Sequence, residues 1–422
     1  MLQGSKFLPW LYQQQLHGIS PGLTRIEFLL EALGHPEKKK PVFHIAGTNG
    51  KGSVAAFSAS LLKAAGVRVG LYTSPHLLNF RERIQIDNTM ISLEDLDQGL
   101  AKIKEIIEHW SSSPTFFEIT TALAFHYFAQ SSCDVIVLET GMGGRLDATN
   151  VATEKIATAI TAIGLDHQEY LGSTLRLIAQ EKAGIMRPEV PLLVLPQERA
   201  VMDVLEETSH RLQVPLRIIE QPLLEKTPLG LAGSYQRWNG ALALQLIEES
   251  PWKLTPDQQA RGLENVSWPG RFQRFSFFGS DDHEIVLDGA HNPQAVSELV
   301  VTWKEIFFHR KCLLIFGALT DKKWELMLSM LDSIASEIYL VPVASTRTLP
   351  PSTMKSFLPR AHLFSSLREA FDEQKSSQRK KNKKNLILRE ASPAPILVTG
   401  SLFLVAEALS LIKGEDYSPF LQ

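Results

Sequence analysis

Short apolar runs alternate with longer amphipathic stretches along most of the chain from residue 42 onwards. The predicted strands are residues 67–72, 134–138, 156–163 and 192–195, and the predicted helices are residues 93–110, 118–130 and 174–184. The strand runs are short and rich in β-branched residues, as is typical of strands buried on both faces. Short strands alternating with longer helices predict a parallel sheet that is covered by helices on both sides.

The character of the sequence changes over residues 251–273, which contain several prolines and end in the run Pro269, Gly270, Arg271. This stretch is typical of a hinge between domains. The alternation then resumes, with predicted strands at residues 284–287, 311–316, 337–341 and 396–398. The pattern predicts an α/β protein with a mostly parallel sheet domain over residues 1–268, followed by a smaller Rossmann-like α/β domain over residues 269–422.

A glycine-rich turn follows the first predicted strand. Residues 44–54 read HIAGTNGKGSV, and the stretch 54–65 after them is a good helix former. A strand, a glycine-rich turn and a helix together make a phosphate cradle, in which backbone N–H groups and the helix N-terminus attract an anion. Lys51 would add a charge for the outer phosphates. The spacing departs from the general phosphate-loop pattern, because Gly52 separates Lys51 from Ser53. A tight structural turn is the alternative.

Composition excludes few classes of function. The 422 residues are 44% hydrophobic and 21% charged with a net charge of -3, so no basic field favours nucleic acid or an acidic membrane. Cys133 and Cys312 lie in apolar runs and are expected to be buried thiols in a reducing compartment. No secretory signal or membrane span is visible, which predicts a cytoplasmic protein. The lysine-rich segment 379–384 is expected to be a solvated loop, with a nucleic-acid patch as the alternative.

Three polar residues follow predicted strands near the glycine-rich turn. Glu139 ends an apolar strand, and an acidic residue beside a nucleotide site is a typical Mg²⁺ ligand. Ser74 follows the strand 67–72 and could offer its hydroxyl to a metal or phosphate, or simply form a Ser-Pro turn. His167 follows another apolar run and is a candidate ligand or acid–base group, with a structural role as the alternative.

The second domain has its own polar strand end, at residues 288–293. Asp288 and His291 lie at a strand-to-helix turn, on the edge of an open α/β sheet where ligands bind. The alternative is that Asp288 caps the following helix.

With these residues in view, the chain resembles the folylpolyglutamate synthase/dihydrofolate synthase family, a branch of the Mur ligase superfamily, from about residue 20 to residue 410. The matching motifs are residues 46–53, 73–77, 117–118, 120–121, 143–150, 171–172, 181–185, 269–271 and 287–293, together with His167 and Asn239. The unusual order Lys51, Gly52, Ser53 is itself the form that this family has.

The resemblance implies a role for each candidate residue. The residues expected to bind ATP are Gly47, Thr48, Asn49, Gly50, Lys51, Gly52, Ser53, Asn239, Arg271, Asp288 and His291. Ser74, Glu139 and His167 are expected to ligate Mg²⁺, with two ions in the site. Lys182 matches a lysine that is carbamylated in the superfamily, and it is expected to act in catalysis with Lys51 and His291. Asp147 and Thr121 match the region that binds the pterin end of the substrate.

The implied reaction is an ATP-dependent ligation of L-glutamate to a pteroate or folate carboxylate through an acyl phosphate. The acceptor would be 7,8-dihydropteroate, a reduced folate or both, in a bifunctional and monomeric enzyme. One alternative is a Mur-type peptidoglycan ligase, which carries an additional N-terminal domain. The phosphate loop here begins about 40 residues into the chain, so that domain is not expected. The other alternative is a non-catalytic, nucleotide-dependent RNA-binding switch, which has no use for Lys182.

Overall fold

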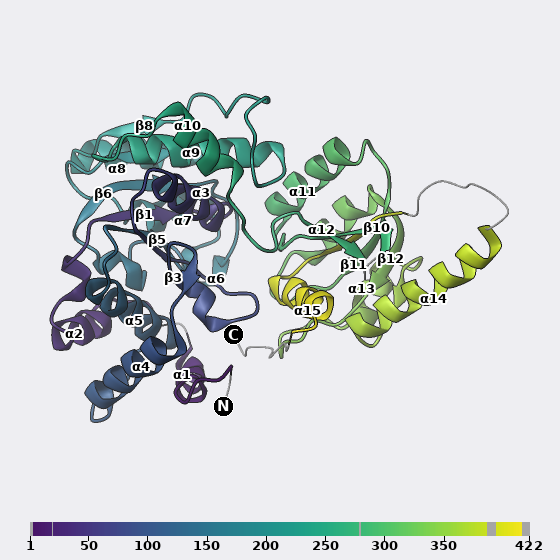
Figure 1. Cartoon of the computed structure of the whole chain (residues 1–422), viewed down its shortest axis with the longest axis horizontal. Coiled ribbons are helices and arrows are strands. Elements are labelled where there is room, and N and C mark those ends of the chain that lie inside the picture. The colour runs from purple at the N-terminus through teal and green to yellow at the C-terminus, as the bar shows by residue number, and fades with distance from the viewer. Residues whose placement is uncertain (1–2, 19, 278–279, 386–393, 416–422) are drawn as a thin grey trace. The chain divides into compact units, whose positions relative to one another are not determined.

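The computed structural model describes residues 3–18, 20–277, 280–385 and 394–415, and it divides the chain into two compact units (Figure 1). Unit 1 is Met1–Ser267 and unit 2 is Trp268–Gln422. The sequence places the domain boundary between residues 268 and 269.

Unit 1 contains an eight-stranded sheet in the order β4-β3-β2-β5-β1-β6-β7-β8. The strands are β1 (Val42–Ala46), β2 (Val69–Tyr72), β3 (Ile84–Ile86), β4 (Thr89–Met90), β5 (Val135–Glu139), β6 (Lys155–Ile160), β7 (Leu192–Val194) and β8 (Leu216–Ile218). All neighbours pair in parallel except β3, which is antiparallel to both β2 and β4. The mostly parallel sheet is therefore as predicted.

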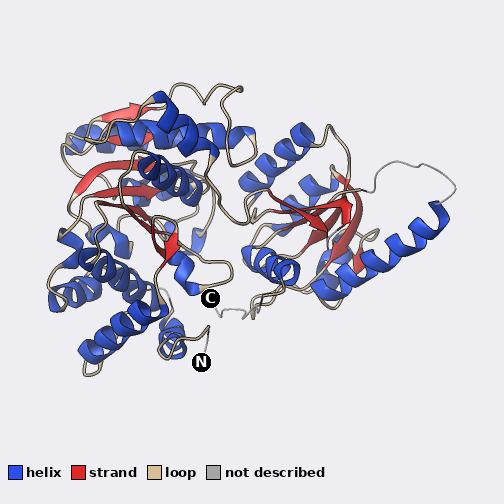
Figure 2. Ribbon diagram, in the orientation of Figure 1, coloured by secondary structure: helices blue, strands red, loops and turns tan. Residues whose placement is uncertain are grey.

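Helices lie on both sides of these strands (Figure 2). They are α1 (Leu8–Gln13), α2 (Thr24–Ala32), α3 (Lys51–Ala64), α4 (Leu93–Ile107), α5 (Phe116–Gln130), α6 (Gln168–Leu171), α7 (Leu175–Ala183), α8 (Arg199–Leu212), α9 (Ser234–Glu248) and α10 (Pro256–Glu264). Four short 3₁₀ helices join them: η1 (Gln14–His17), η2 (Pro36–Lys38), η3 (Phe80–Arg83) and η4 (Ala148–Val151). Central strands covered on two faces bury their whole length, which explains their continuous apolar runs.

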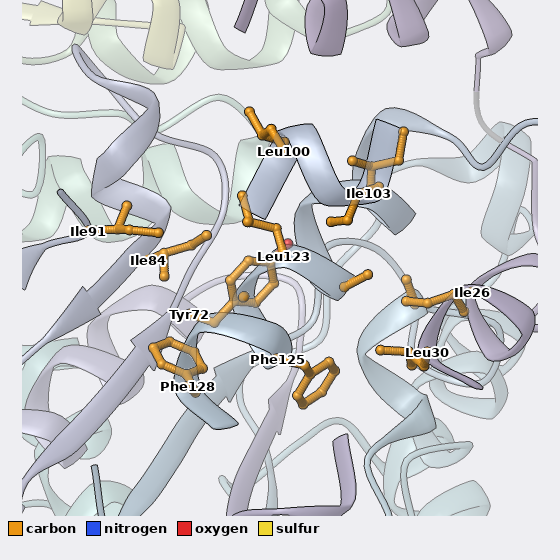
Figure 3. Packing of buried hydrophobic residues seen from close by; sticks show 14 of the residues in the cluster. Ile26, Leu30, Tyr72, Ile84, Ile91, Leu100, Ile103, Leu123, Phe125 and Phe128 are labelled. Carbon is orange, nitrogen blue, oxygen red and sulfur yellow. The ribbon is translucent and has the colours of Figure 1, made fainter. Parts of the chain in front are cut away.

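Helix α5 shows how local sequence and core packing agree. The Thr115 hydroxyl accepts the Glu118 N–H, and the Glu118 carboxylate accepts the Thr115 N–H. This capping box fixes where the helix begins. Leu123, Phe125 and Phe128 of this helix are almost fully buried and belong to one cluster with residues of α2, α4 and β3 (Figure 3). Burial of each such side chain contributes roughly 1.5–3 kcal/mol.

Unit 2 contains a six-stranded sheet in the order β13-β12-β11-β14-β10-β9. Its elements are β9 (Gln273–Phe277), β10 (Ser280–Leu287), α11 (Pro293–Ile306), β11 (Cys312–Phe316), α12 (Trp324–Asp332), β12 (Ala335–Leu340), α13 (Pro351–Phe357), β13 (His362–Leu363), α14 (Leu367–Asn385), β14 (Ile396–Thr399) and α15 (Leu402–Lys413). Among the described strands of this sheet, β9 alone pairs antiparallel, with β10. This is the smaller α/β unit that the sequence predicts.

The stretch 251–273, expected to be a hinge, contains the boundary between the two units at Ser267 and Trp268, but nine of its residues form helix α10. Thr255 caps this helix in a reciprocal pair with Gln258, and Pro256 occupies the first helical turn, where proline is well tolerated. The helix packs on α3: the Ser60 hydroxyl donates to the Gly262 carbonyl at 2.7 Å. Pro256 therefore marks the start of a helix, whereas Pro269 lies close to the boundary between the units.

The lysine-rich segment 379–384 lies within helix α14, so the expectation of a loop is also wrong. Lysine, arginine and glutamine are good helix formers, and this stretch has no glycine or proline to stop the helix. Helix α14 is 19 residues long but strongly polar. Among the helices of the described residues, none combines the length and the apolar character that a membrane span requires.

Candidate active site

The glycine-rich turn connects β1 to α3. All five residues of β1 are buried, and α3 begins at Lys51 with Gly50 as its N-cap. The amides of Thr48 and Asn49 both donate to the Ala162 carbonyl, at 2.9 and 3.1 Å, and so tie the turn to the segment after β6. The Lys51 ammonium donates to the Thr48 carbonyl at 3.1 Å. A 14-residue helix thus begins with a lysine above a fixed turn, which is a favourable site for phosphate.

Gly47 is the tightest position of this turn. Its φ of 149° lies outside the range that side chains favour. A Cβ at Gly47 would lie 1.8 Å from the Thr161 Oγ1, which is far inside van der Waals contact. Only glycine fits here without moving β6 or the turn.

Gly47→Ala is therefore expected to displace the turn and weaken ATP binding by roughly a hundredfold or more, in line with the loss of several aligned phosphate contacts. Isothermal titration with ATP measures the change. Gly66→Ala is the matched control, because Gly66 also has a positive φ, of 83°, but a Cβ there meets nothing within 4 Å. If both variants bind ATP equally well, the clash with Thr161 does not matter.

A second support of the turn comes from α9 and was not predicted. The Gln236 Nε2 donates to the Ser53 hydroxyl at 3.2 Å, and the Asn239 Nδ2 donates to the Gln236 Oε1 at 2.9 Å. All three side chains are buried. Asn239 is a predicted ATP-binding residue, whereas Gln236 was missed. The spacing of three residues, which puts both amides on one face of a helix, is the signal that could have found it.

The predicted metal ligands follow strands that are neighbours in the sheet. Ser74 follows β2, Glu139 ends β5, the phosphate turn follows β1 and His167 follows β6, and the sheet order is β2-β5-β1-β6. These strands are parallel, so all four segments leave the sheet at the same edge. Ligands of open α/β sheets bind at this edge.

Glu139 is the buried carboxylate of this edge, with 4% of its surface exposed. Its Oε2 accepts the Ser74 N–H at 3.1 Å, which brings β5 and the segment after β2 together. His167 is exposed and adopts a left-handed conformation, with φ of 49°, at the start of α6. Within the described ranges, no three His, Cys, Asp or Glu side chains are grouped closely enough to hold a metal by themselves.

This donor set still suits Mg²⁺. Mg²⁺ typically takes one or two carboxylates and completes its shell with water and substrate phosphates. A single buried carboxylate, a serine and a neighbouring phosphate turn meet that requirement. The imidazole of His167 is a less usual partner for so hard an ion.

Lys182 lies in the last turn of α7 and is almost fully buried. Its Nζ donates to the Gly47 carbonyl at 2.6 Å, so the lysine touches the phosphate turn directly. Burial, with the nearby charge of Lys51, lowers the pKa of Lys182 to about 7, against the opposing effect of Asp166 and Asp147. About half of a population with this pKa is neutral at neutral pH. A neutral amine is the form that adds CO₂.

Asp147 and Thr121, the predicted folate contacts, are both engaged inside the protein. The Asp147 carboxylate accepts the N–H groups of Met142 at 2.8 Å and Thr149 at 3.0 Å. Burial raises its pKa. The Thr121 hydroxyl pairs with the Tyr72 hydroxyl at 3.0 Å, and Thr121 has no exposed surface. Thr121 therefore supports Tyr72 from inside the unit.

The predicted residues of unit 2 form a cluster at the end of β10. The Asp288 carboxylate accepts the N–H groups of Phe272 at 2.8 Å and Ala290 at 2.9 Å. Burial raises the pKa of Asp288, opposed first by the charge of Arg271. The Arg271 guanidinium lies against Gly289, where an added Cβ would meet it at 2.7 Å. Arg271 and Asp288 are therefore held in one local arrangement.

His291 has a defined tautomer. Its Nδ1 lies 2.8 Å from the Gly289 carbonyl, which can only accept, so Nδ1 carries the proton in the neutral ring. The alternative role of Asp288 as a helix cap is wrong, because Asn292 caps α11 through the Ala295 N–H at 2.9 Å. Asp288 instead holds the turn before that helix.

Two family models match the chain. The Mur ligase middle domain matches residues 45–215, which contain the phosphate turn, Glu139, His167 and Lys182. The Mur ligase, glutamate ligase domain matches residues 270–388, which contain Arg271, Asp288 and His291. The two matches fall on opposite sides of the boundary between the units.

Several relatives and solved structures are similar over nearly the whole chain. A dihydrofolate synthase/folylpolyglutamate synthase of Bacillus subtilis is 33% identical, covering 96% of this chain and 98% of the relative. The structure of Escherichia coli FolC in complex with DHPP and ADP has a TM-score of 0.86 at 29% identity, covering 97% of this chain and 98% of that one. Mycobacterium tuberculosis folylpolyglutamate synthase complexed with ADP and AMPPCP has a TM-score of 0.84 at 30% identity, covering 97% and 100%. The chain therefore belongs to the folylpolyglutamate synthase/dihydrofolate synthase family of Mur ligases.

Proposed function

We propose that this protein joins L-glutamate to the carboxylate of a pteroate or folate at the expense of ATP, as a dihydrofolate synthase, a folylpolyglutamate synthase or both. Relatives with these names cover nearly all of the chain. The observation that carries the proposal is the contact of Lys182 with Gly47, which puts a buried amine of lowered pKa against the phosphate turn. A nucleotide switch without catalysis has no need for such a group.

The ATP phosphates are proposed to lie on residues 47–53, above the N-terminus of α3. Backbone N–H groups and the helix dipole favour the anion, and Lys51 neutralises the outer phosphates. Asn239 supports the turn from α9 through Gln236 and Ser53. Arg271, Asp288 and His291 are proposed as the ATP contacts of unit 2.

Ser74, Glu139 and His167 are proposed to hold Mg²⁺, with a second ion near Lys182. Bound Mg²⁺ would offset the charge on the phosphoryl group during transfer. Glu139 supplies the charged oxygen for this task. Carbamylation would convert Lys182 from an amine into a carboxylate, the chemical type that such an ion prefers.

The reaction needs activation before the amide can form. The acceptor carboxylate attacks the γ-phosphate of ATP in line, and ADP leaves, which gives an acyl phosphate. Lys51 offsets the charge that spreads over the transferring group. The neutral amine of glutamate then attacks the acyl carbon, and inorganic phosphate leaves. The protonated Nδ1 of His291 faces the Gly289 carbonyl, so its Nε2 carries the lone pair of the neutral ring, and His291 is proposed as the base for this amine.

Product analysis tests the function. The protein is incubated with ATP, Mg²⁺ and glutamate, and 7,8-dihydropteroate and a reduced folate are offered in separate reactions. The masses of the products are measured by mass spectrometry. A mass increase of one glutamate, with ADP formed in equal amount, supports the proposal and assigns the acceptor. Absence of product with both acceptors contradicts it and favours a Mur-type ligase, or an RNA-binding switch if RNA binds with a steep salt dependence. We further propose that the active species is a cytoplasmic monomer.

Lys51→Ala is expected to weaken ATP binding far more than AMP binding, roughly a hundredfold against less than threefold, because the lysine acts on the outer phosphates. Competitive titration of both nucleotides measures the ratio. Lys63→Ala, on the same helix but bonded to the Asp87 carbonyl, is the control and should change neither affinity. Equal weakening of ATP and AMP by Lys51→Ala would contradict the assignment.

A further inference from the structure

His44 is a fully buried histidine that the proposed reaction does not use. It lies in the middle of β1, three residues before Gly47, with Leu138 and Thr158 as its partners on the neighbouring strands. Its Nε2 is 2.8 Å from the Thr149 hydroxyl, which belongs to the short helix η4. Burial of a polar ring at the centre of a sheet costs free energy unless the ring is hydrogen-bonded, because burial removes its hydration.

Counting protons fixes the direction of this contact. The Thr149 hydroxyl donates its single proton to the Asp147 Oδ1. It can therefore only accept from His44, so the His44 Nε2 carries a proton and Nδ1 does not. Burial and the nearby charges of Lys155 and Arg187 lower the pKa of His44 well below its ordinary value, so the ring stays neutral. Within the described residues, Nδ1 has no hydrogen-bond partner. The single N–H of the His44 ring is thus donated to the Thr149 hydroxyl.

Asp147 closes the glycine-rich turn that follows Glu139. One carboxylate oxygen accepts the Met142 N–H at 2.8 Å, while the other accepts both the N–H and the hydroxyl of Thr149. The same turn is bound to α7, because the Arg145 N–H donates to the Glu181 carbonyl at 2.7 Å. The turn therefore lies between Glu139 on one side and the helix that carries Lys182 on the other.

We propose that His44 is a positioning residue for the acceptor side of the site: through Thr149 it fixes Asp147, and Asp147 fixes the turn of residues 140–147. This inference rests on the proposed function and on the expected role of Asp147, which matches the region that binds the pterin end of the acceptor. The chain of donors starts on β1, which also leads into the phosphate turn. One strand would thus set the geometry of both substrates, with the phosphate turn at its end and the acceptor turn along its side.

Two substitutions of His44 separate a hydrogen-bonding role from simple packing. His44→Leu fills the space but donates nothing, whereas His44→Gln keeps an amide N–H of similar reach. In His44→Leu, hydrogen exchange of residues 141–149 should become at least about tenfold faster, and the KM for the acceptor should rise about tenfold while the KM for ATP stays within about twofold. His44→Gln should restore most of both properties.

His126→Leu is the matched control, since His126 is another buried histidine, and its Nε2 lies 3.0 Å from the Gln130 Nε2 on the same helix, α5. It should change neither the exchange of residues 141–149 nor the ratio of the two KM values. The tautomer gives a further check. The ¹⁵N signals of the His44 ring should show a protonated Nε2 over the whole pH range in which the protein stays folded.

Three results would overturn the inference. They are unchanged exchange in His44→Leu, an equal rise of both KM values, and a His44→Gln variant as impaired as His44→Leu. Hydrogen exchange needs no turnover, so it tests the relay even if wild-type protein forms no glutamate adduct. In that case the proposed function fails while the exchange result still decides whether His44 holds the turn.

Discussion

A Lys182→Ala variant is expected to lose about a thousandfold or more of its turnover and to regain part of it when formate or acetate is added. The lysine is buried against the Gly47 carbonyl, and its pKa is lowered to about 7. Removal of the side chain leaves room for a small carboxylic acid, whose oxygens can replace those of a carbamate. Steady-state rates with increasing formate measure the rescue. Rescue by methylamine instead would show that Lys182 works as a cation.

Lys155→Ala provides the control for this rescue. Lys155 is also buried, and its pKa is lowered too, but its Nζ donates to the Asn150 Oδ1 at 2.8 Å and the Ile185 carbonyl at 3.0 Å. Its role is therefore to hold Asn150 and Ile185 in place, and carboxylic acids should not restore the turnover that Lys155→Ala loses. If formate stimulates both variants equally, the stimulation is unspecific.

The same proposal predicts a pH dependence. The pKa of Lys182 lies below its ordinary value, so the native protein holds the amine neutral above pH about 7 and protonates it below. Only the neutral amine adds CO₂. At constant dissolved CO₂, the activity of protein first stripped of CO₂ should therefore recover faster as the pH rises through about 7. Recovery that does not depend on pH between 6 and 8 would contradict carbamylation at this lysine.

Glu139→Gln is expected to lower kcat about a hundred- to thousandfold and to raise the Mg²⁺ concentration needed for half-maximal rate. The amide oxygen can still accept the Ser74 N–H, so the substitution removes the charge and little else. Titration of Mg²⁺ at saturating ATP measures both effects. A variant with a normal rate at limiting Mg²⁺ would exclude Glu139 as a ligand.

Glu118→Gln is a matched control for this change. Glu118 is an equally buried carboxylate, but it caps α5 and pairs with Arg25 at 3.1 Å. Its replacement should lower the midpoint of thermal unfolding and leave the Mg²⁺ dependence unchanged. A raised Mg²⁺ requirement in both variants would show that the loss of any buried negative charge has this effect.

The parts of the fold that depend on local pattern could be predicted from the sequence. The buried strands β1, β5 and β11 have short apolar runs, which favour strands covered on both faces, and β1 runs directly into a glycine turn in which Gly47 leaves no room for a Cβ. The helix α10 was missed because a proline at the first turn looks like a break unless its cap is recognised. The loop expected at residues 379–384 is wrong because a run of lysines predicts exposure to solvent but does not exclude a helix.

The candidate site shows the same division. The local sequence indicates Lys51, in a glycine-rich turn, and Glu139, at the end of an apolar strand, whereas Lys182 is indicated only by the family resemblance. His44 cannot be found this way, since its partner lies 105 positions away, and Gln236, whose partner Ser53 lies 183 positions away, is indicated only by its spacing from Asn239. Such pairs depend on the order of the strands and on which helix covers them, and no local pattern encodes that order.

The packing of α10 on α3 has a practical consequence for dissecting the protein. Gly262 lies so close to Leu61 that a Cβ there would meet the Leu61 Cα at 2.8 Å, and Leu61 is fully buried beneath it. A recombinant fragment that ended near residue 250 would lack this cover and expose the back of the very helix that begins at Lys51. The smallest fragment expected to stay monodisperse and retain nucleotide affinity therefore extends through Glu264.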